Sequence, residues 1–325
     1  MLREHYFSLL AALIACLTAF ILVEAYVRIV VDDGMQFDLE MWKYARDVKR
    51  ISQHPLRGHE HAPNREARLM GVDFRTNSRG LRDRNFDYDR TPKTNRVLML
   101  GDSLTLGWGV PVEDTFSKRI ERMFSDQGVT AEIINAGVGN YNTIQEVEFF
   151  LTEGYKYKPD IVVLNFFVND AEPLPQSNPP SLLARNCYSC VFVAGRVDTL
   201  LRSLARKKDW FEYYLDLYGH GSAPGWLASK ASLQKLIDHT KNYNIKLLVA
   251  SLPELHDVNS YKFQLITDLV KAVADSNGVP FVDILGQLKD QPSEKLWVTP
   301  PDPHPNAYAN AYIAKGLFEA LQRLM

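Results

Sequence analysis

Hydrophobic and polar positions divide this chain into three zones. The first 31 residues are mostly apolar, and Tyr6 to Val23 contains no charged residue. Residues 32–95 are polar, rich in arginine and aspartate, and only weakly periodic. From Arg96 onward, short apolar runs alternate with longer stretches of helical periodicity. That alternation is typical of a domain in which strands and helices take turns along the chain.

The short apolar runs after Arg96 predict five buried strands, because they are brief and rich in β-branched and aromatic residues. Helical stretches of 10 to 17 residues separate them, which implies βαβ units and a parallel sheet. We expect the strands at 97–100, 131–134, 161–168, 246–250 and 280–282. We expect the main helices at 115–124, 143–153, 228–242, 261–277 and 306–324.

These elements predict an α/β fold, a three-layer α/β/α sandwich on a mainly parallel five-stranded sheet with a flavodoxin-like arrangement. Ligand sites in such sheets lie beyond the carboxyl ends of the strands. Residues 171–223 interrupt the pattern with a Pro-rich stretch and an aromatic segment, so we expect an insertion that forms a lid or rim. The aromatic residues from Trp210 to Trp226 could stack on sugars, although a packed helix is the simpler interpretation.

The N-terminal zone predicts a transmembrane helix. The 18 uncharged residues from Tyr6 to Val23 would span about 27 Å as a helix, close to the ~30 Å hydrocarbon core of a bilayer. Arg3 precedes the run, as expected for a cytoplasmic flank. A cleaved signal peptide and a buried helix of a soluble protein are the alternatives. The apolar run is long for a signal peptide, and the sequence after it is a poor cleavage site, so we expect a retained membrane anchor at 1–31.

The rest of the chain then divides into two parts. Residues 32–95 are expected to form a stalk and an N-terminal extension, and residues 96–325 the folded domain, outside the cytoplasm. The segment GVDFRTNSRGLRD at 71–83 is part of this extension. The boundary at residue 32 follows from the end of the anchor, and the boundary at residue 96 follows from the change of pattern at Arg96.

Composition limits the partners of the chain. The net charge of −2 offers no basic excess to neutralise phosphates, so we do not expect a nucleic-acid partner. His54, His59 and His61 lie close together, but no carboxylate or cysteine pattern completes a metal site, so we expect an exposed polar loop and no metal. Cys187 and Cys190 are either free thiols or a local disulfide, the latter in an oxidising compartment.

Polar or glycine residues follow three of the predicted strands and precede the last helix. They are GDSL at 101–104, a glycine loop at 135–143, VND at 168–170 and DPH at 302–304. Each motif alone is explained at least as well by a helix cap or a turn. Because the carboxyl ends of parallel strands meet at one edge of a sheet, together they provide a nucleophile, oxyanion donors, a base and its orienting acid.

This set resembles the SGNH/GDSL hydrolase superfamily, whose four sequence blocks appear here in the same order across residues 96–324. The resemblance implies an SGNH hydrolase fold and assigns roles by position. Ser103 would be the nucleophile and, through its backbone N–H, one oxyanion donor. His304 would be the general base, and Asp302 would orient it. Residues 71–83 are similar to a segment that precedes the domain in some membrane-anchored bacterial members.

The resemblance also implies the remaining oxyanion donors. They would be the backbone N–H of Gly139, with Asn140 as the alternative alignment, and the side-chain amide of Asn169. Two positions depart from the family pattern. Phe167 stands where the family usually has glycine, and the aspartate precedes the histidine by two residues where the family often has three.

The activity implied by the resemblance is that of a serine hydrolase that needs no cofactor. It would cleave an O-acyl ester of a carbohydrate or lipid at the cell surface, in the periplasm or outside the cell, through an acyl-enzyme on Ser103. The same groups could instead transfer the acyl group to an extracellular polysaccharide. A third interpretation is an inactive glycan-binding or assembly protein held at the membrane.

Overall fold

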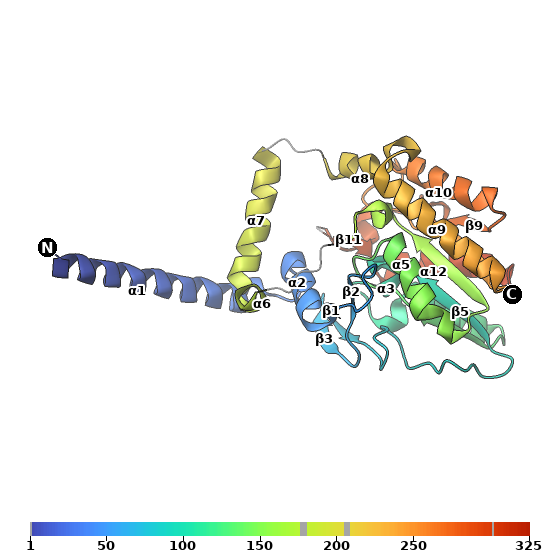
Figure 1. The fold of residues 1–325 in the computed structure, drawn as a ribbon, viewed down its shortest axis with the longest axis horizontal. Coiled ribbons are helices and arrows are strands. Elements are labelled where there is room, and N and C mark those ends of the chain that lie inside the picture. Colours follow the sequence, from blue (N-terminus) through green and yellow to red (C-terminus); the bar gives the residue numbers. More distant parts are fainter. Residues whose placement is uncertain (1, 176–180, 205–208, 301) are drawn as a thin grey trace.

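The computed structural model describes residues 2–175, 181–204, 209–300 and 302–325, and Figure 1 shows its fold. Residues 176–180 and 205–208 of the predicted insertion lie outside the described residues, as does Pro301 in the Pro-rich segment before His304. A long N-terminal helix projects from a body that holds the C-terminus on its far side (Figure 1).

A parallel five-stranded sheet forms the centre of the body, in the strand order β6-β5-β7-β8-β9. The strands are β5 (Asn95–Leu100), β6 (Ala131–Asn135), β7 (Ile161–Phe166), β8 (Lys246–Ser251) and β9 (Phe281–Asp283). All five strands predicted from the sequence are confirmed. Strand β7 ends at Phe166, earlier than expected, because the chain turns there into the 3₁₀ helix η4 (Val168–Ala171).

Helices cover both faces of the sheet and complete the three predicted layers. Successive residues of a strand point to opposite faces. Leu98 and Leu100 of β5 thus belong to one core, and Val97 and Met99 to the other. The first core lies under α5 (Thr143–Thr152), α9 (Pro224–Asn242) and α10 (Gln264–Ser276). The second lies under α4 (Phe116–Asp126), α11 (Leu285–Leu288) and α12 (Ala307–Gln322).

The N-terminal zone is helical throughout its described part. Helix α1 (Leu2–Tyr26) continues into the π-helix η1 (Val27–Val31). The segment from His5 to Val31 has a mean hydropathy of 2.5 in its most apolar window, and none of that window is buried. By length and composition this helix is able to cross a membrane, which is consistent with an anchor or a signal sequence.

Residues 32–95 are more structured than their weak periodicity indicates. They contain α2 (Phe37–Asp47) and two antiparallel hairpins. The hairpins pair β1 (Lys49–Ile51) with β2 (His59–His61), and β3 (Glu66–Leu69) with β4 (Val72–Arg75). A small core holds this extension against the main domain, because Tyr44 and Phe74 pack with Trp108, which follows β5. The extension is therefore fastened to the domain near the end of a central strand.

The expected exposed polar loop around His54, His59 and His61 is wrong for His61, which is only 4% exposed. Its Nε2 lies 2.6 Å from the hydroxyl of Tyr44, and its Nδ1 lies 2.9 Å from the carbonyl oxygen of Gly80. These two hydrogen bonds satisfy the ring and allow it to be buried. His61 thus contributes to packing that the local sequence pattern does not reveal.

The insertion between η4 and α9 is mainly helical where it is described. It contains α6 (Leu182–Asn186), α7 (Tyr188–Leu204), α8 (Trp210–Tyr218) and η5 (Gly219–Gly221). In the aromatic segment, Tyr218 and Trp226 are buried in the core, whereas Trp210 is 41% and Tyr213 45% exposed, so only its C-terminal part is core. Cys187 and Cys190 form a disulfide at the start of α7. The 3₁₀ helices η2 (Val112–Asp114), η3 (Gly154–Tyr157) and η6 (Ser293–Lys295) complete the connections.

Candidate active site

Ser103 opens the short helix α3 (Ser103–Leu106) just beyond the end of β5. Asp102 caps this helix, since its Oδ1 accepts a hydrogen bond of 2.8 Å from the backbone N–H two residues on. A side chain at Gly101 would bring its Cβ within 2.0 Å of Thr105 Oγ1, so only glycine fits before the cap. The tight strand-to-helix turn therefore fixes where the Ser103 hydroxyl points.

His304 reaches this serine from the other end of the chain. It lies on β11 (Asp302–Pro305), which pairs antiparallel with β10 (Trp297–Thr299) just before α12. His304 Nε2 lies 2.8 Å from Ser103 Oγ, across 201 positions of sequence. The Nδ1 of the same ring is hydrogen-bonded to Asp302 Oδ1. Because the carboxylate accepts the Nδ1 proton, Nε2 is left to accept the proton of the serine hydroxyl.

Asp302 is completely buried and held from two sides. Its Oδ2 accepts a hydrogen bond of 3.0 Å from the indole Nε1 of Trp108, and its Oδ1 accepts one of 3.2 Å from the backbone N–H of His304. The spacing of two residues, which departs from the family pattern, thus still brings the carboxylate to the imidazole. Trp108 was not identified from the sequence, where nothing links it to a position 194 residues away.

The glycine loop is connected to the N-terminal extension by a chain of hydrogen bonds. Gly139 N–H donates to the Tyr44 hydroxyl at 2.9 Å, and this hydroxyl in turn donates to His61 Nε2. Burial raises the pKa of Tyr44 and lowers the pKa of His61 to about 3, so both groups are neutral near pH 7. The backbone N–H of Gly139, which the family resemblance implies is an oxyanion donor, is therefore already hydrogen-bonded to Tyr44.

Two further side chains of the extension hold the same loop. Lys49 Nζ donates to Gly139 O at 2.7 Å and to Asn140 Oδ1 at 2.8 Å, and His59 Nε2 lies 3.0 Å from Gly139 O. Burial lowers the pKa of Lys49 to about 7. Asn140 has a positive φ of 65°, and among the described residues no acceptor is recorded for its N–H. Sequence reasoning missed Tyr44 and Lys49, because no motif marks them.

Asn169 lies on η4, beyond the end of β7, and its Nδ2 donates to Asp102 Oδ2 at 3.0 Å. The turn that carries it is held by Asp170, whose Oδ2 accepts from the backbone N–H of Phe167 at 2.8 Å. Burial, with the nearby Asp102 carboxylate, raises the pKa of Asp170 well above its usual range. Phe167 has an extended backbone, with φ −131°, so this turn does not require the glycine found in the family pattern.

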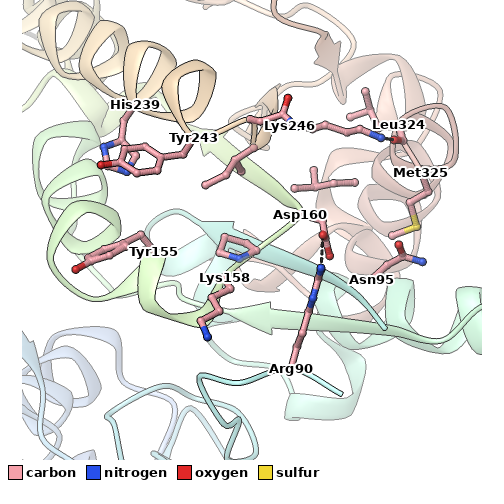
Figure 2. Close-up of a pocket in the computed structure, with 14 residues that line it drawn as sticks. Arg90, Asn95, Tyr155, Lys158, Asp160, His239, Tyr243, Lys246, Leu324 and Met325 are labelled. Carbon is pink, nitrogen blue, oxygen red and sulfur yellow. Dashed lines mark hydrogen bonds and ion pairs between the residues drawn. The ribbon is translucent and has the colours of Figure 1, made fainter. Parts of the chain in front are cut away.

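A hollow of about 630 Å³ lies at the opposite edge of the sheet, where the strands begin (Figure 2). Asn95 starts β5 and Lys246 starts β8, and an ion pair between Arg90 and Asp160 crosses the hollow. None of the sequence motifs reaches this edge. Sites in parallel sheets lie at the carboxyl ends of the strands, which is the edge where Ser103 lies. Among the described residues, no group of three or more potential ligands could hold a metal ion.

The sequence also matches a known family as a whole. The model of the GDSL-like Lipase/Acylhydrolase family matches residues 99–312, well over half of the chain. The chain belongs to this family. The match confirms the resemblance inferred from the four motifs. It identifies this chain, called the GDSL chain below, as an enzyme that hydrolyses esters.

Several solved structures are similar to this GDSL chain. TesA has 13% sequence identity and a TM-score of 0.49, with 71% of this chain and 100% of TesA covered. The psychrotrophic esterase EstA from Pseudoalteromonas sp. has 13% identity and a TM-score of 0.45, covering 71% and 98%. The acetyl xylan esterase AlAXEase has 16% identity and a TM-score of 0.45, covering 69% and 98%. A comparison with curated proteins found no match.

Proposed function

We propose that this GDSL chain is a serine esterase that cleaves an O-acyl ester through an acyl-enzyme on Ser103. The observation that carries the proposal is the unbroken hydrogen-bond series from Ser103 Oγ to His304 Nε2 and from His304 Nδ1 to Asp302. His304 takes the hydroxyl proton as Ser103 attacks the ester carbonyl. It then returns the proton to the leaving alcohol, and Asp302 stabilises the charged ring in between.

In the second half of the reaction, water replaces the alcohol. His304 takes a proton from the water as the water attacks the acyl group, and it gives that proton to Ser103 Oγ as the carboxylic acid leaves. Because the same base serves acylation and deacylation, a single histidine beside the serine is sufficient for the whole reaction.

The oxyanion formed in each half requires nearby N–H donors. We assign Ser103 N–H, the second N–H of the Asn169 amide and the Asn140 N–H, in preference to Gly139. Asn169 uses one of its two amide protons on Asp102, and Gly139 N–H is engaged by Tyr44. Each such donor typically contributes about 3 to 4 kcal/mol to transition-state stabilisation.

The location that we propose is the outer side of a membrane, in the periplasm or outside the cell, with α1 as a retained anchor. The apolar segment His5–Val31 and the Cys187–Cys190 disulfide support this location, since disulfides persist in oxidising compartments. An enzyme fixed there meets O-acyl groups on carbohydrates or lipids of the cell surface. We propose these esters as its substrate class.

The test compares Ser103→Ala with Ser251→Ala in the full-length protein. Ser251 is also buried and also lies at a strand's carboxyl end, that of β8, so it is a matched control. We expect Ser103→Ala to lower the kcat for p-nitrophenyl acetate by about four orders of magnitude or more, with Tm unchanged, and Ser251→Ala to retain turnover. Full turnover by Ser103→Ala would refute the assignment. Acetyl groups that appear on an added polysaccharide, rather than as free acetate, would identify a transferase.

A further inference from the structure

Helix α7 has two faces of opposite character. Its inner face packs on α2, where the Tyr188 ring lies 4.8 Å from Trp42 and a Cβ at Gly195 would come within 2.8 Å of Asp38. At 100° per residue, the positions around 193, 197, 200 and 201 fall on the opposite side of the helix. The side chains there are apolar and exposed, namely Val193 at 49%, Val197 at 46%, Leu200 at 56% and Leu201 at 56%.

The start of α7 is fixed to the end of the apolar N-terminal helix. The Glu24 carboxylate accepts hydrogen bonds from the backbone N–H groups of Tyr188, at 3.0 Å, and Ser189, at 2.8 Å. The Arg28 guanidinium lies over the Tyr188 ring, 4.2 Å from its centre. The direction of α7 relative to α1 is thus set by several contacts at one junction.

Figure 1 shows α7 running crosswise to α1, with α2 and the catalytic domain on the side away from α1. The face that packs on α2 therefore looks toward the domain, and the exposed apolar face looks toward the side on which α1 extends. If α1 stands across a bilayer, α7 runs along the bilayer surface with its apolar face toward the lipid.

The charge of this segment matches such a surface. Helix α7 contains two basic residues, Arg196 and Arg202, against one acidic residue, Asp198, and the sequence after it adds Arg206, Lys207 and Lys208, although the whole chain has a net charge of −2. Helices with one apolar face and an excess of lysine and arginine lie in the plane of bilayers that contain anionic lipids. Helix α7 has 17 residues, three of them charged, which does not fit a helix that crosses the bilayer.

We propose that α7 is an interfacial helix that lies on an anionic lipid bilayer beside the anchor α1. This inference rests on the proposed anchoring by α1 and adds a second point of membrane contact. The same α2 helix that packs on α7 places the Phe37 ring 6.4 Å from the His304 ring. Contact of α7 with lipid therefore fixes the orientation of the active site relative to the membrane surface.

The test uses the full-length protein in vesicles of phosphatidylcholine and phosphatidylglycerol. The background variant is Cys16→Ser, in which the two remaining cysteines, Cys187 and Cys190, are joined in the disulfide. In this background, Val197→Cys carries an environment-sensitive nitrobenzoxadiazole label. We expect its emission to shift to the blue and to be quenched by lipids that carry a nitroxide near the headgroup. Retained ester turnover checks that the labelled protein is folded.

Two other labelled variants make the result interpretable. Ile14→Cys, at the middle of the apolar run of α1, reports on the anchor and is read with lipids that carry the nitroxide deep in the acyl chain. Tyr243→Cys, 68% exposed near the far end of α9, should be neither shifted nor quenched by either lipid. If position 14 is quenched and position 197 is not, the α7 inference fails while the anchor stands. A blue shift at 197 without lipid quenching also overturns it, since protein then covers the face. If position 14 is not quenched, anchor and inference fail together.

Discussion

Two regions of this molecule carry the same carboxylate–histidine pair, and only in one of them does the imidazole reach a serine hydroxyl. Asp302 and His304 are two residues apart, as are Glu254 and His256 after β8. In both pairs the histidine Nδ1 is hydrogen-bonded to the carboxylate. In both, the backbone N–H of the histidine donates to that same carboxylate, at 3.2 Å for His304 and 3.0 Å for His256.

The pairs differ in what lies beyond the imidazole. His304 Nε2 reaches Ser103 Oγ, whereas the His256 ring lies 4.7 Å from the Trp210 ring and 5.6 Å from the Trp297 ring, measured between centroids. Among the described residues, no hydroxyl or thiol is recorded in contact with the His256 ring. A short local spacing is therefore enough to orient a histidine, and a nucleophile from a distant strand is needed to make it a catalytic base.

The largest expected effect separates the two histidines. His304→Gln removes the proposed general base and should lower kcat by about three orders of magnitude. His256→Gln should leave kcat near the wild-type value, because no reacting group lies at its ring. Steady-state hydrolysis of p-nitrophenyl acetate by both full-length variants measures the contrast, and equal losses in the two would show that the pairs are not distinct in function.

The carboxylates should follow the same order with smaller effects. Asp302→Asn keeps the shape of the side chain but no longer stabilises the charged imidazole, so kcat should fall roughly a hundredfold or more. Glu254→Gln makes the corresponding change at the other pair and should have little effect on kcat. A fall in kcat for Glu254→Gln as large as that for Asp302→Asn would place the second pair in the reaction.

A third change concerns the hydrogen bond that holds Asp302, the carboxylate proposed to orient His304. Trp108→Phe removes the indole donor to Asp302 and should lower kcat about tenfold, since a hydrogen bond to a charged group contributes about 1.5 to 3 kcal/mol. Tyr261→Phe is the control beside the other pair, because its hydroxyl accepts from Glu254 N–H at 3.3 Å. Unchanged kcat in a folded Trp108→Phe protein would mean that the indole does not assist Asp302.

The smallest expected effect is on the pH dependence of stability. Burial raises the pKa of Glu254 above its usual value, although the contact with His256 opposes the shift. Above about pH 4.5 the unfolded chain has lost the Glu254 proton while the folded chain still holds it, so the folded state loses stability as pH rises through this window. Glu254→Gln lacks this ionisation, and its Tm relative to wild type should rise with pH. A Tm difference that is constant with pH would contradict this.

Much of the fold was predictable because burial on both faces of a parallel sheet requires continuous apolar runs. The run that becomes β5 is one example, and it also places Ser103 at the strand end. His304 was predictable because a family motif marks it. The contacts of Tyr44 and Lys49 with the glycine loop were not, since they depend on how the extension folds back on the domain. Local sequence gives no signal of such tertiary packing, and it did not distinguish Asn140 from Gly139 as a donor.

The central claim is that Ser103 is a nucleophile activated by His304. The most direct measurement treats the full-length protein with a fluorophosphonate and locates the adduct by mass spectrometry of its peptides. The account predicts a single adduct on Ser103 that forms quickly in the wild type and in His256→Gln and very slowly in His304→Gln. An adduct on another residue, or equal labelling rates in His304→Gln and the wild type, would contradict it.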